Sequence, residues 1–198
     1  CADDTPEESD DQQLTYGGNV IYKTSETYDG KLNTRDKNYE GTYQGIEKAN
    51  DLCANDPNRP AECKNASAFF SASTSYELKN LYEHIGFDPE KPMFVYDPVS
   101  EEYKKMSNNW ESMFSCTLFE GTKDILMSGS DYWTGSYWDG SSVESREEGY
   151  GSCEAWTSDK DTYGTFGPSN SGISWLYNSG KANCQWPDMS LLCVCEKN

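Results

Sequence analysis

Residues 45–53 of this chain read GIEKANDLC, and residues 67–71 read SAFFS. In the first segment Ile46, Ala49 and Cys53 are spaced as i, i+3 and i+7, which places them on one face of a helix. The second segment is short and bounded by polar residues, as is typical of a strand. The two segments predict an amphipathic helix followed by a strand.

A second helix is predicted at residues 76–84, capped by Ser75 and stopped by Gly86. Its apolar side would carry Leu78, Leu81, Tyr82 and Ile85. Further short strands are predicted at residues 14–16, 20–24, 93–96, 132–135 and 191–196. About fifty residues between the last two strands show little periodicity, which indicates a long loop that carries function or is held by disulfides.

The net charge restricts the partners of this protein. The 198 residues include 34 acids and 16 bases, which gives a net charge of −18 and a pI near 4.3. Phosphate backbones, heparin-like chains and anionic lipid surfaces repel such a polyanion, so we expect no nucleic-acid partner. No apolar run approaches the roughly 18 residues of a spanning helix.

Several motifs follow one another in the order found in a known family. They occupy residues 45–53, 68–71, 76–82, 91–95, 110–115, 133–135, 139–140, 153–156, 184 and 192–194. Over roughly residues 20–196 the chain resembles the endostatin domain, which also occurs in bacterial surface lipoproteins of spirochaetes. The resemblance implies an α+β, C-type-lectin-like fold over residues 14–198. That fold has two small mixed or antiparallel sheets, two helices and a long disulfide-stapled loop.

Eight cysteines in a small acidic chain indicate an oxidising, extracytoplasmic compartment. The family resemblance implies two disulfides, Cys53–Cys193 and Cys153–Cys184. Because Cys193 and Cys195 lie two residues apart on one predicted strand and face the same way, we also expect Cys63 to pair with Cys195. Cys116 is then left without a partner.

The start of the sequence resembles a processed bacterial lipoprotein, in which a diacylglycerol is attached to the first cysteine, here Cys1. Residues 1–13 contain six acids and no base, so we expect a disordered, solvated tether. This interpretation places the protein at the cell surface, anchored to an outer membrane by an acyl chain. The alternatives are a fragment boundary, or a Cys1 that pairs with another cysteine.

The aromatic residues, 14% of the chain, fall into two groups. Trp133 and Trp156 stand where the family buries a core tryptophan beside a disulfide, so we expect them to pack in the core. The other group lies in turn-rich segments, where exposed rings stack on sugar faces or anchor protein interfaces. These candidate ligand-binding residues, about half of them expected at the surface, are Tyr137, Trp138, Tyr150, Tyr163, Trp175 and Trp186.

One short motif suggests calcium as the single candidate cofactor. Asp159 and Asp161, followed by Tyr163 and Gly164, resemble half of a calcium loop, although no closing glutamate follows at the expected spacing. The alternative is a solvated acidic surface. The zinc and heparin sites of the endostatin family do not carry over, because the chain has one histidine and few bases.

The sequence contains no catalytic motif, so we expect a binding protein and not an enzyme. The principal hypothesis is an adhesin or receptor that binds an extracellular glycan or protein through the long loop. The first alternative is a self-assembling subunit of an extracellular sheath or filament. The second is a cysteine-based oxidising enzyme of the same broad fold, which would use Cys193 and Cys195.

Overall fold

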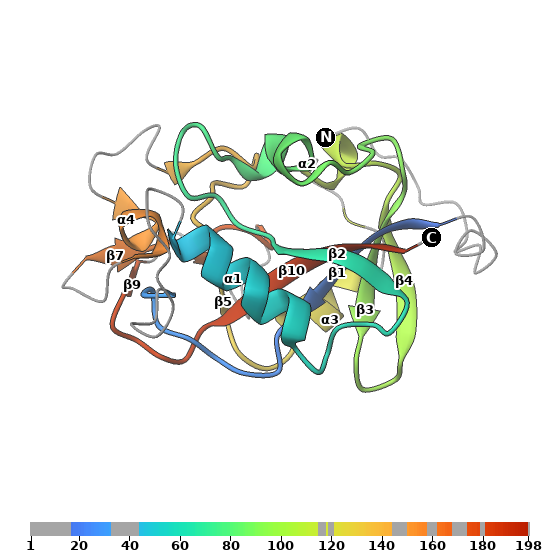
Figure 1. Ribbon diagram of the computed structural model, residues 1–198, viewed down its shortest axis with the longest axis horizontal. Coiled ribbons are helices and arrows are strands. Elements are labelled where there is room, and N and C mark those ends of the chain that lie inside the picture. Colours follow the sequence, from blue (N-terminus) through green and yellow to red (C-terminus); the bar gives the residue numbers. More distant parts are fainter. Residues whose placement is uncertain are drawn as a thin grey trace.

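The computed structural model describes residues 17–32, 44–114, 118, 121–143, 150–157, 162–167, 174–178 and 181–197. In this part of the chain the protein is a mixed α+β structure with two sheets (Figure 1). The sequence predictions that fall outside the described residues concern the strand at 14–16, the tether at 1–13, Cys1, Cys116, Asp159 and Asp161.

The larger sheet is organised around its C-terminal strand, β10 (Ser190–Lys197). The first six residues of this strand, SLLCVC, are all buried, which is the pattern of a strand covered on both faces. The other strands of the sheet are β1 (Gly18–Lys23), β2 (Cys63–Ala68), β3 (Met93–Asp97), β4 (Glu102–Ser107), β5 (Tyr132–Trp133) and β8 (Phe166–Gly167). The strand order is β4-β3-β1-β10-β5-β8, and β2 also pairs with β10.

The pairing in this sheet is mixed. Strand β1 runs antiparallel to β10, with Ile21 opposite Val194, and β3 runs parallel to β1. Strand β5 runs parallel to β10, whereas β2 is antiparallel to it. The strands predicted at residues 20–24, 93–96 and 191–196 are therefore confirmed as members of one sheet.

The smaller sheet comprises β6 (Tyr150–Gly151), β7 (Tyr163–Gly164) and β9 (Ala182–Asn183), in the order β6-β7-β9. It lies at one end of the molecule, at the left in Figure 1, and the β3–β4 hairpin lies toward the other end. All three strands come from the segment for which the sequence showed little periodicity. The prediction of two sheets is thus confirmed, but only this one is small, since the other has seven strands among the described residues.

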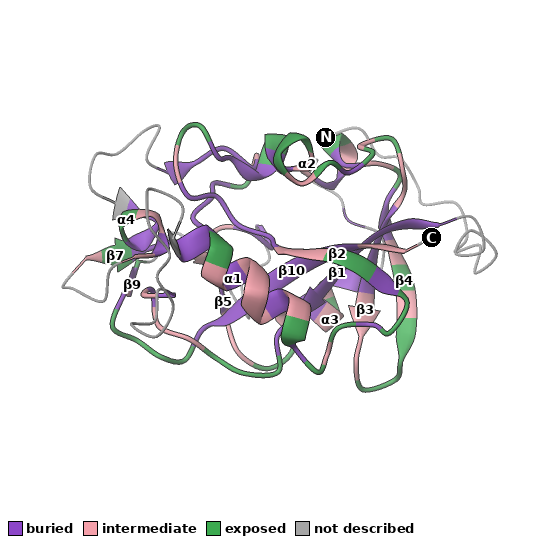
Figure 2. Ribbon diagram, viewed as in Figure 1, coloured by how far each residue is buried: buried purple, intermediate pink, exposed green. Residues whose placement is uncertain are grey.

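The predicted amphipathic helix is confirmed as α1 (Gln44–Asn55), which packs against β2 and β10. Ile46, Ala49 and Cys53 are buried on its inner face, as their spacing predicts. Figure 2 shows this alternation of buried and exposed positions along the helix.

The second predicted helix is shorter than expected. Tyr76 pairs back with Ser73 in an isolated bridge, so the chain is still turning where the helix was predicted to begin. A 3-10 turn, η2 (Leu78–Asn80), leads into α2 (Leu81–Ile85). The N-cap residues are Glu77 and Asn80, not Ser75, and the N–H of Leu78 donates to the Ser71 hydroxyl at 2.9 Å. The predicted stop is confirmed, because Gly86 ends α2 in the left-handed conformation.

Two helices are also too few for the described residues. The structure adds a 3-10 turn, η3 (Glu111–Phe114), and two short helical segments, α3 (Thr122–Met127) and α4 (Cys153–Trp156). The four residues of α4 all have positive φ angles, between 47° and 63°, so α4 is a single left-handed turn.

The strand predicted at residues 67–71 is displaced toward the N-terminus. Strand β2 ends at Ala68 because the chain then changes partners. The N–H of Phe69 still donates to Leu192 of β10, but the N–H of Ser71 donates to Thr134, beyond β5. The apolar run at 68–70 therefore marks the crossing between two sheet neighbours, and all of it is buried.

The core contains the tryptophans that the family resemblance places there. Trp133 and Trp156 are fully buried with their ring centroids 5.6 Å apart, and Trp156 packs on Phe70 at 5.0 Å. A β-carbon added at Gly164 would contact both Trp133 and the sulfur of Cys153, which locates the core tryptophan beside a disulfide.

Three disulfides join the described residues: Cys53–Cys193, Cys63–Cys195 and Cys153–Cys184. They are the three expected pairs. The first two both connect the α1–β2 region to β10, and the third connects α4 to the residue after β9. Within the described ranges, no helix is both long and apolar enough to span a membrane.

Candidate functional site

The six aromatic candidates separate into exposed and buried residues. Trp138, Tyr163 and Trp186 are 53%, 39% and 54% exposed, respectively. Tyr137 and Trp175 are buried, and Tyr150 lies in β6 with its side chain outside the described part of the structure. Half of the set is therefore available to a ligand in this conformation.

Trp175 is a core residue, contrary to its assignment as a ligand-binding residue. Its ring stacks on Phe69 at 5.8 Å, and its Nε1 donates to the main-chain oxygen of Met113 at 3.4 Å. The hydroxyl of Tyr132 donates to the main-chain oxygen of Trp175, and burial raises the pKa of Tyr132 above its usual value. A ligand could reach the Trp175 ring only if this packing opened.

Tyr137 is buried for a different reason, because it forms the base of a tight turn. Its N–H donates to Ser141 and its carbonyl accepts from Gly140, so the chain reverses at residues 138–139. The Tyr137 ring packs against Tyr177 at 5.2 Å. Trp138, at the tip of the reversal, is left in solvent.

Segment 77–79 anchors the Trp138 turn. The main-chain N–H of Lys79 donates to Gly140 at 3.0 Å, and the N–H of Ser142 donates to Glu77 Oε1 at 2.9 Å. Gly140 has a φ of +75°, and a β-carbon there would come within 2.6 Å of Phe114. The turn is thus closely packed, although its tip is exposed.

Tyr163 lies in β7, and Trp186 follows the turn that begins at Asn183, the last residue of β9. Tyr163 of β7 is directly opposite Asn183 of β9, so the two side chains project from the same face of the small sheet. Asn183 then begins a turn, in which its carbonyl accepts from the N–H of Trp186 at 3.0 Å and its Oδ1 accepts from Gln185 at 2.9 Å. We call Tyr163, Asn183 and Trp186 the β7–β9 aromatic surface.

This surface combines two rings with an amide. Aromatic faces stack on the apolar faces of sugars or of partner side chains, and an amide both donates and accepts hydrogen bonds. Sequence reasoning did not identify Asn183, because β9 is only two residues long and has no periodicity to detect. The available signal was Asn183 itself, because an asparagine side chain can bond the main chain two residues on and so favours a turn.

The β7–β9 aromatic surface is covalently fixed to the core. Cys184, next to Asn183, is bonded to Cys153, the first residue of α4. Both cysteines are buried, and the N–H of Cys184 donates to Thr162, which precedes Tyr163. The residues next to Tyr163 and Asn183 are therefore joined to each other and to α4.

The left-handed turn α4 is stabilised from several sides. A left-handed conformation costs an L-residue roughly 1–2 kcal/mol. The Ser152 hydroxyl accepts from the N–H of Ala155 at 3.2 Å, and Trp156 Nε1 donates to the Ser71 carbonyl at 3.0 Å. A β-carbon at Gly45 would lie 2.5 Å from the carbonyl oxygens of Ala155 and Trp156, so the start of α1 packs directly on this turn.

Metal and thiol chemistry have little support among the described residues. No three of their His, Cys, Asp and Glu side chains are grouped so as to hold a metal ion, and the predicted calcium ligands Asp159 and Asp161 lie outside them. Cys193 and Cys195, which the oxidising-enzyme alternative would use, are both in disulfides.

Comparison of the chain with protein-family models and with curated protein sequences gives no match.

Proposed function

We propose that this protein is an extracellular ligand-binding protein, an adhesin or receptor, that binds a glycan or a protein through the β7–β9 aromatic surface. The observation that carries the proposal is the distribution of exposed apolar side chains. In the described part of the chain the large exposed hydrophobic residues are Val99, Trp138, Tyr163 and Trp186. Three of these four are aromatic. Tyr163 lies in β7 opposite Asn183, and the N–H of Trp186 donates to the carbonyl of that same Asn183.

Exposure of large rings on a rigid support favours binding. A preordered aromatic anchor loses little conformational entropy when it is covered by a ligand. The Cys153–Cys184 disulfide and the packed turn α4 provide such a support. Trp133 and Trp156, which pack in the core, are fully buried by contrast.

The net charge narrows the ligand class. At −18, the protein repels sulfated and other strongly anionic chains, so the proposal concerns neutral glycans and neutral or basic proteins. The mixed α+β structure, the second small sheet and the stapled segment agree with the C-type-lectin-like architecture that we propose for the domain. The three disulfides support an oxidising compartment.

The test is a binding screen of the purified protein against immobilised neutral glycans and extracellular-matrix proteins. We expect at least one ligand whose binding is lost in Trp186→Ala and Tyr163→Ala and kept in Val99→Ser. Val99 is the matched control, because it is 92% exposed and lies between β3 and β4. The β3–β4 hairpin lies away from the small sheet in Figure 1.

Two results would contradict the proposal. One is the absence of any ligand for a protein that is shown to be folded. The other is concentration-dependent self-assembly in sedimentation experiments that Trp186→Ala abolishes. The second result would replace the binding function with the sheath or filament alternative, in which the same rings pack neighbouring copies.

A further inference from the structure

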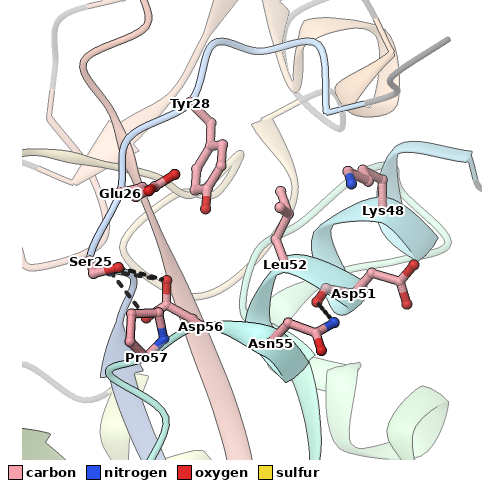
Figure 3. A pocket seen from close by; sticks show the side chains of 9 residues that line it. All are labelled: Ser25, Glu26, Tyr28, Lys48, Asp51, Leu52, Asn55, Asp56 and Pro57. Carbon is pink, nitrogen blue, oxygen red and sulfur yellow. Dashed lines mark hydrogen bonds between the residues drawn. The ribbon is translucent and has the colours of Figure 1, made fainter. Parts of the chain in front are cut away.

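A second surface feature lies away from the β7–β9 aromatic surface. A hollow of about 280 Å³ opens between α1 and the segment that follows β1 (Figure 3). Ser25, Glu26 and Tyr28 form one wall, and Lys48, Leu52 and Asp56 belong to α1 and the turn after it. The proposed aromatic function does not use this hollow.

We propose that this hollow binds a primary alkylammonium group, the chemistry of a lysine side chain or of a free alkylamine. The proposal goes beyond the aromatic surface and does not depend on it. Three properties of the hollow support it: its apolar walls, its negative charge and the fixed position of its buried carboxylate.

The walls of the hollow suit an alkyl chain. The Tyr28 ring and the Leu52 side chain face the same space from opposite sides in Figure 3, and Pro57 adds a third apolar surface. Tyr28 and Leu52 are half-buried, so each keeps a surface that a small ligand can cover. Contacts between such surfaces and methylene groups are favourable, since they remove apolar area from water.

The electrostatic character of the hollow favours a cation. Its lining includes the carboxylates of Glu26, Asp51 and Asp56 and one ammonium, that of Lys48. Burial, together with the nearby Asp56 and Glu26 carboxylates, raises the pKa of the Tyr28 hydroxyl. Burial is the larger cause and disfavours a charge of either sign, whereas the carboxylates disfavour a phenolate and attract an ammonium group.

The buried carboxylate of this wall is preordered. Asp56 is 8% exposed and accepts hydrogen bonds from the N–H of Ser25 at 3.1 Å, the Ser25 hydroxyl at 3.2 Å and the N–H of Asn58 at 2.8 Å. These bonds occupy its oxygens and fix its position, so it acts on a ligand through its field. The Glu26 carboxylate, which is exposed and oriented toward Tyr28 in Figure 3, is placed to contact the ammonium directly.

A bound metal ion is the less suitable occupant. Within the described residues no group of three His, Cys, Asp or Glu side chains is arranged to hold one, the walls of this hollow included. A monovalent ammonium needs fewer oxygen ligands than a divalent ion, and its alkyl chain uses the apolar walls that a metal would leave uncovered.

Lys48 provides the sharpest internal test. Its ammonium points from α1 toward Tyr28 in Figure 3, and it therefore competes with a cationic ligand. Lys48→Met keeps most of the alkyl stem and removes the charge, so it should strengthen ammonium binding about two- to fivefold, the range of an exposed charge pair. Glu26→Gln should weaken binding by a similar factor.

The experiment is an NMR titration of the intact protein with n-butylammonium, followed on the Tyr28 ring and the Leu52 methyl groups. The controls are n-butanol as the neutral analogue, butyrate as the anion, and Glu47→Gln, which removes an exposed α1 carboxylate that does not line the hollow. A parallel titration with Nα-acetyl-lysine amide determines whether a peptide-borne lysine is accepted as well as a free amine.

The expected result is saturable shifts with n-butylammonium, weaker in Glu26→Gln, stronger in Lys48→Met, and unchanged in Glu47→Gln and in Trp186→Ala. Equal shifts with n-butanol would overturn the proposal, because the carboxylates would then have no role. No shifts at either residue, or an equal loss in Glu26→Gln and Glu47→Gln, would also overturn it. None of these outcomes bears on the aromatic surface.

Discussion

The Glu77 carboxylate accepts a 2.9 Å hydrogen bond from the main-chain N–H of Ser142, 65 positions further along the chain. Its other oxygen lies 3.0 Å from the Lys79 ammonium, and the Glu77 residue as a whole is only 9% exposed. A buried carboxylate immediately before η2 thus holds the turn that presents Trp138. This contact explains how a turn with an exposed tip keeps one conformation.

Glu77→Ala should therefore destabilise the protein more than Lys79→Ala. Loss of Glu77 leaves the buried Ser142 N–H without its acceptor, at a cost of about 1–3 kcal/mol. The Lys79 side chain is 44% exposed, and pairs of that kind contribute about 0.2–1 kcal/mol. Urea unfolding of the two variants measures the loss in the free energy of unfolding. Equal losses would show that the Ser142 contact contributes no more to stability than the Lys79 pair does.

The two disulfides that reach β10 should be strongly non-additive. Cys53–Cys193 and Cys63–Cys195 span 140 and 132 residues and join the same two regions. With either one intact, the other closes only a short additional loop. We expect each single removal to cost about 3 kcal/mol and the double removal to exceed twice that value, because the long loop alone is worth about 5 kcal/mol. Thermal unfolding of Cys→Ala pairs measures this, and strict additivity would contradict it.

Removal of Cys153–Cys184, which spans 31 residues, should cost about 3–4 kcal/mol and also disorder the β7–β9 aromatic surface. Trp156 is anchored by its own bond to Ser71, so the main sheet should survive. In a double Cys153→Ala, Cys184→Ala variant we expect hydrogen exchange to rise at Tyr163 and Asn183 while β1 and β10 stay protected. Uniform loss of protection would show that the small sheet and the main sheet unfold together.

Two glycines with positive φ differ in whether a β-carbon would meet a neighbouring atom. Gly135 and Gly86 both have positive φ, +59° and +73°. A β-carbon at Gly135 would lie 2.2 Å from the main-chain oxygen of Ser71, whereas nothing lies within 4 Å at Gly86. Gly86→Ala should cost about 1–2 kcal/mol for the left-handed backbone alone, and Gly135→Ala about 4 kcal/mol or more. Similar melting temperatures for the two variants would contradict the close approach of residue 135 to Ser71.

Alkaline pH should destabilise the protein in part through Tyr76. Burial raises the pKa of Tyr76 from 10.0 to about 12. Between these values the unfolded chain releases the phenolic proton and the folded chain keeps it, so stability falls as pH rises from about 10 to about 12, by about 1.4 kcal/mol per pH unit for one group. Urea midpoints across this range should fall less steeply in Tyr76→Phe. An identical slope in the variant would mean that Tyr76 titrates normally.

Much of the main sheet could be predicted from local sequence patterns, whereas Cys53–Cys193 and Cys153–Cys184 were expected only from the family resemblance. Helix α1 and strands β1, β3 and β10 have strong local patterns, and the i, i+2 spacing of Cys193 and Cys195 placed both sulfurs on one face of β10. The crossing at residues 68–71 could not be located, because burial alone does not distinguish a strand from a segment that moves between two strand partners.

The candidate site was harder to predict. Whether an aromatic residue is buried depends on contacts far along the chain, such as that of Trp175 with Phe69, and no local pattern encodes them. Strand β9 and the left-handed turn α4 could not be predicted for the same reason: they depend on contacts far along the chain. Each is short, and each is held by the Cys153–Cys184 disulfide and by tertiary packing.

We propose above all that the β7–β9 aromatic surface binds a ligand. The most direct test compares Trp186→Ala, Val99→Ser and the unmodified protein on one array of neutral glycans and matrix proteins. We predict that the array identifies a ligand, that Val99→Ser retains it, and that Trp186→Ala loses most of the affinity at unchanged melting temperature. Equal binding by all three folded proteins, or no binding by any of them, would contradict the claim.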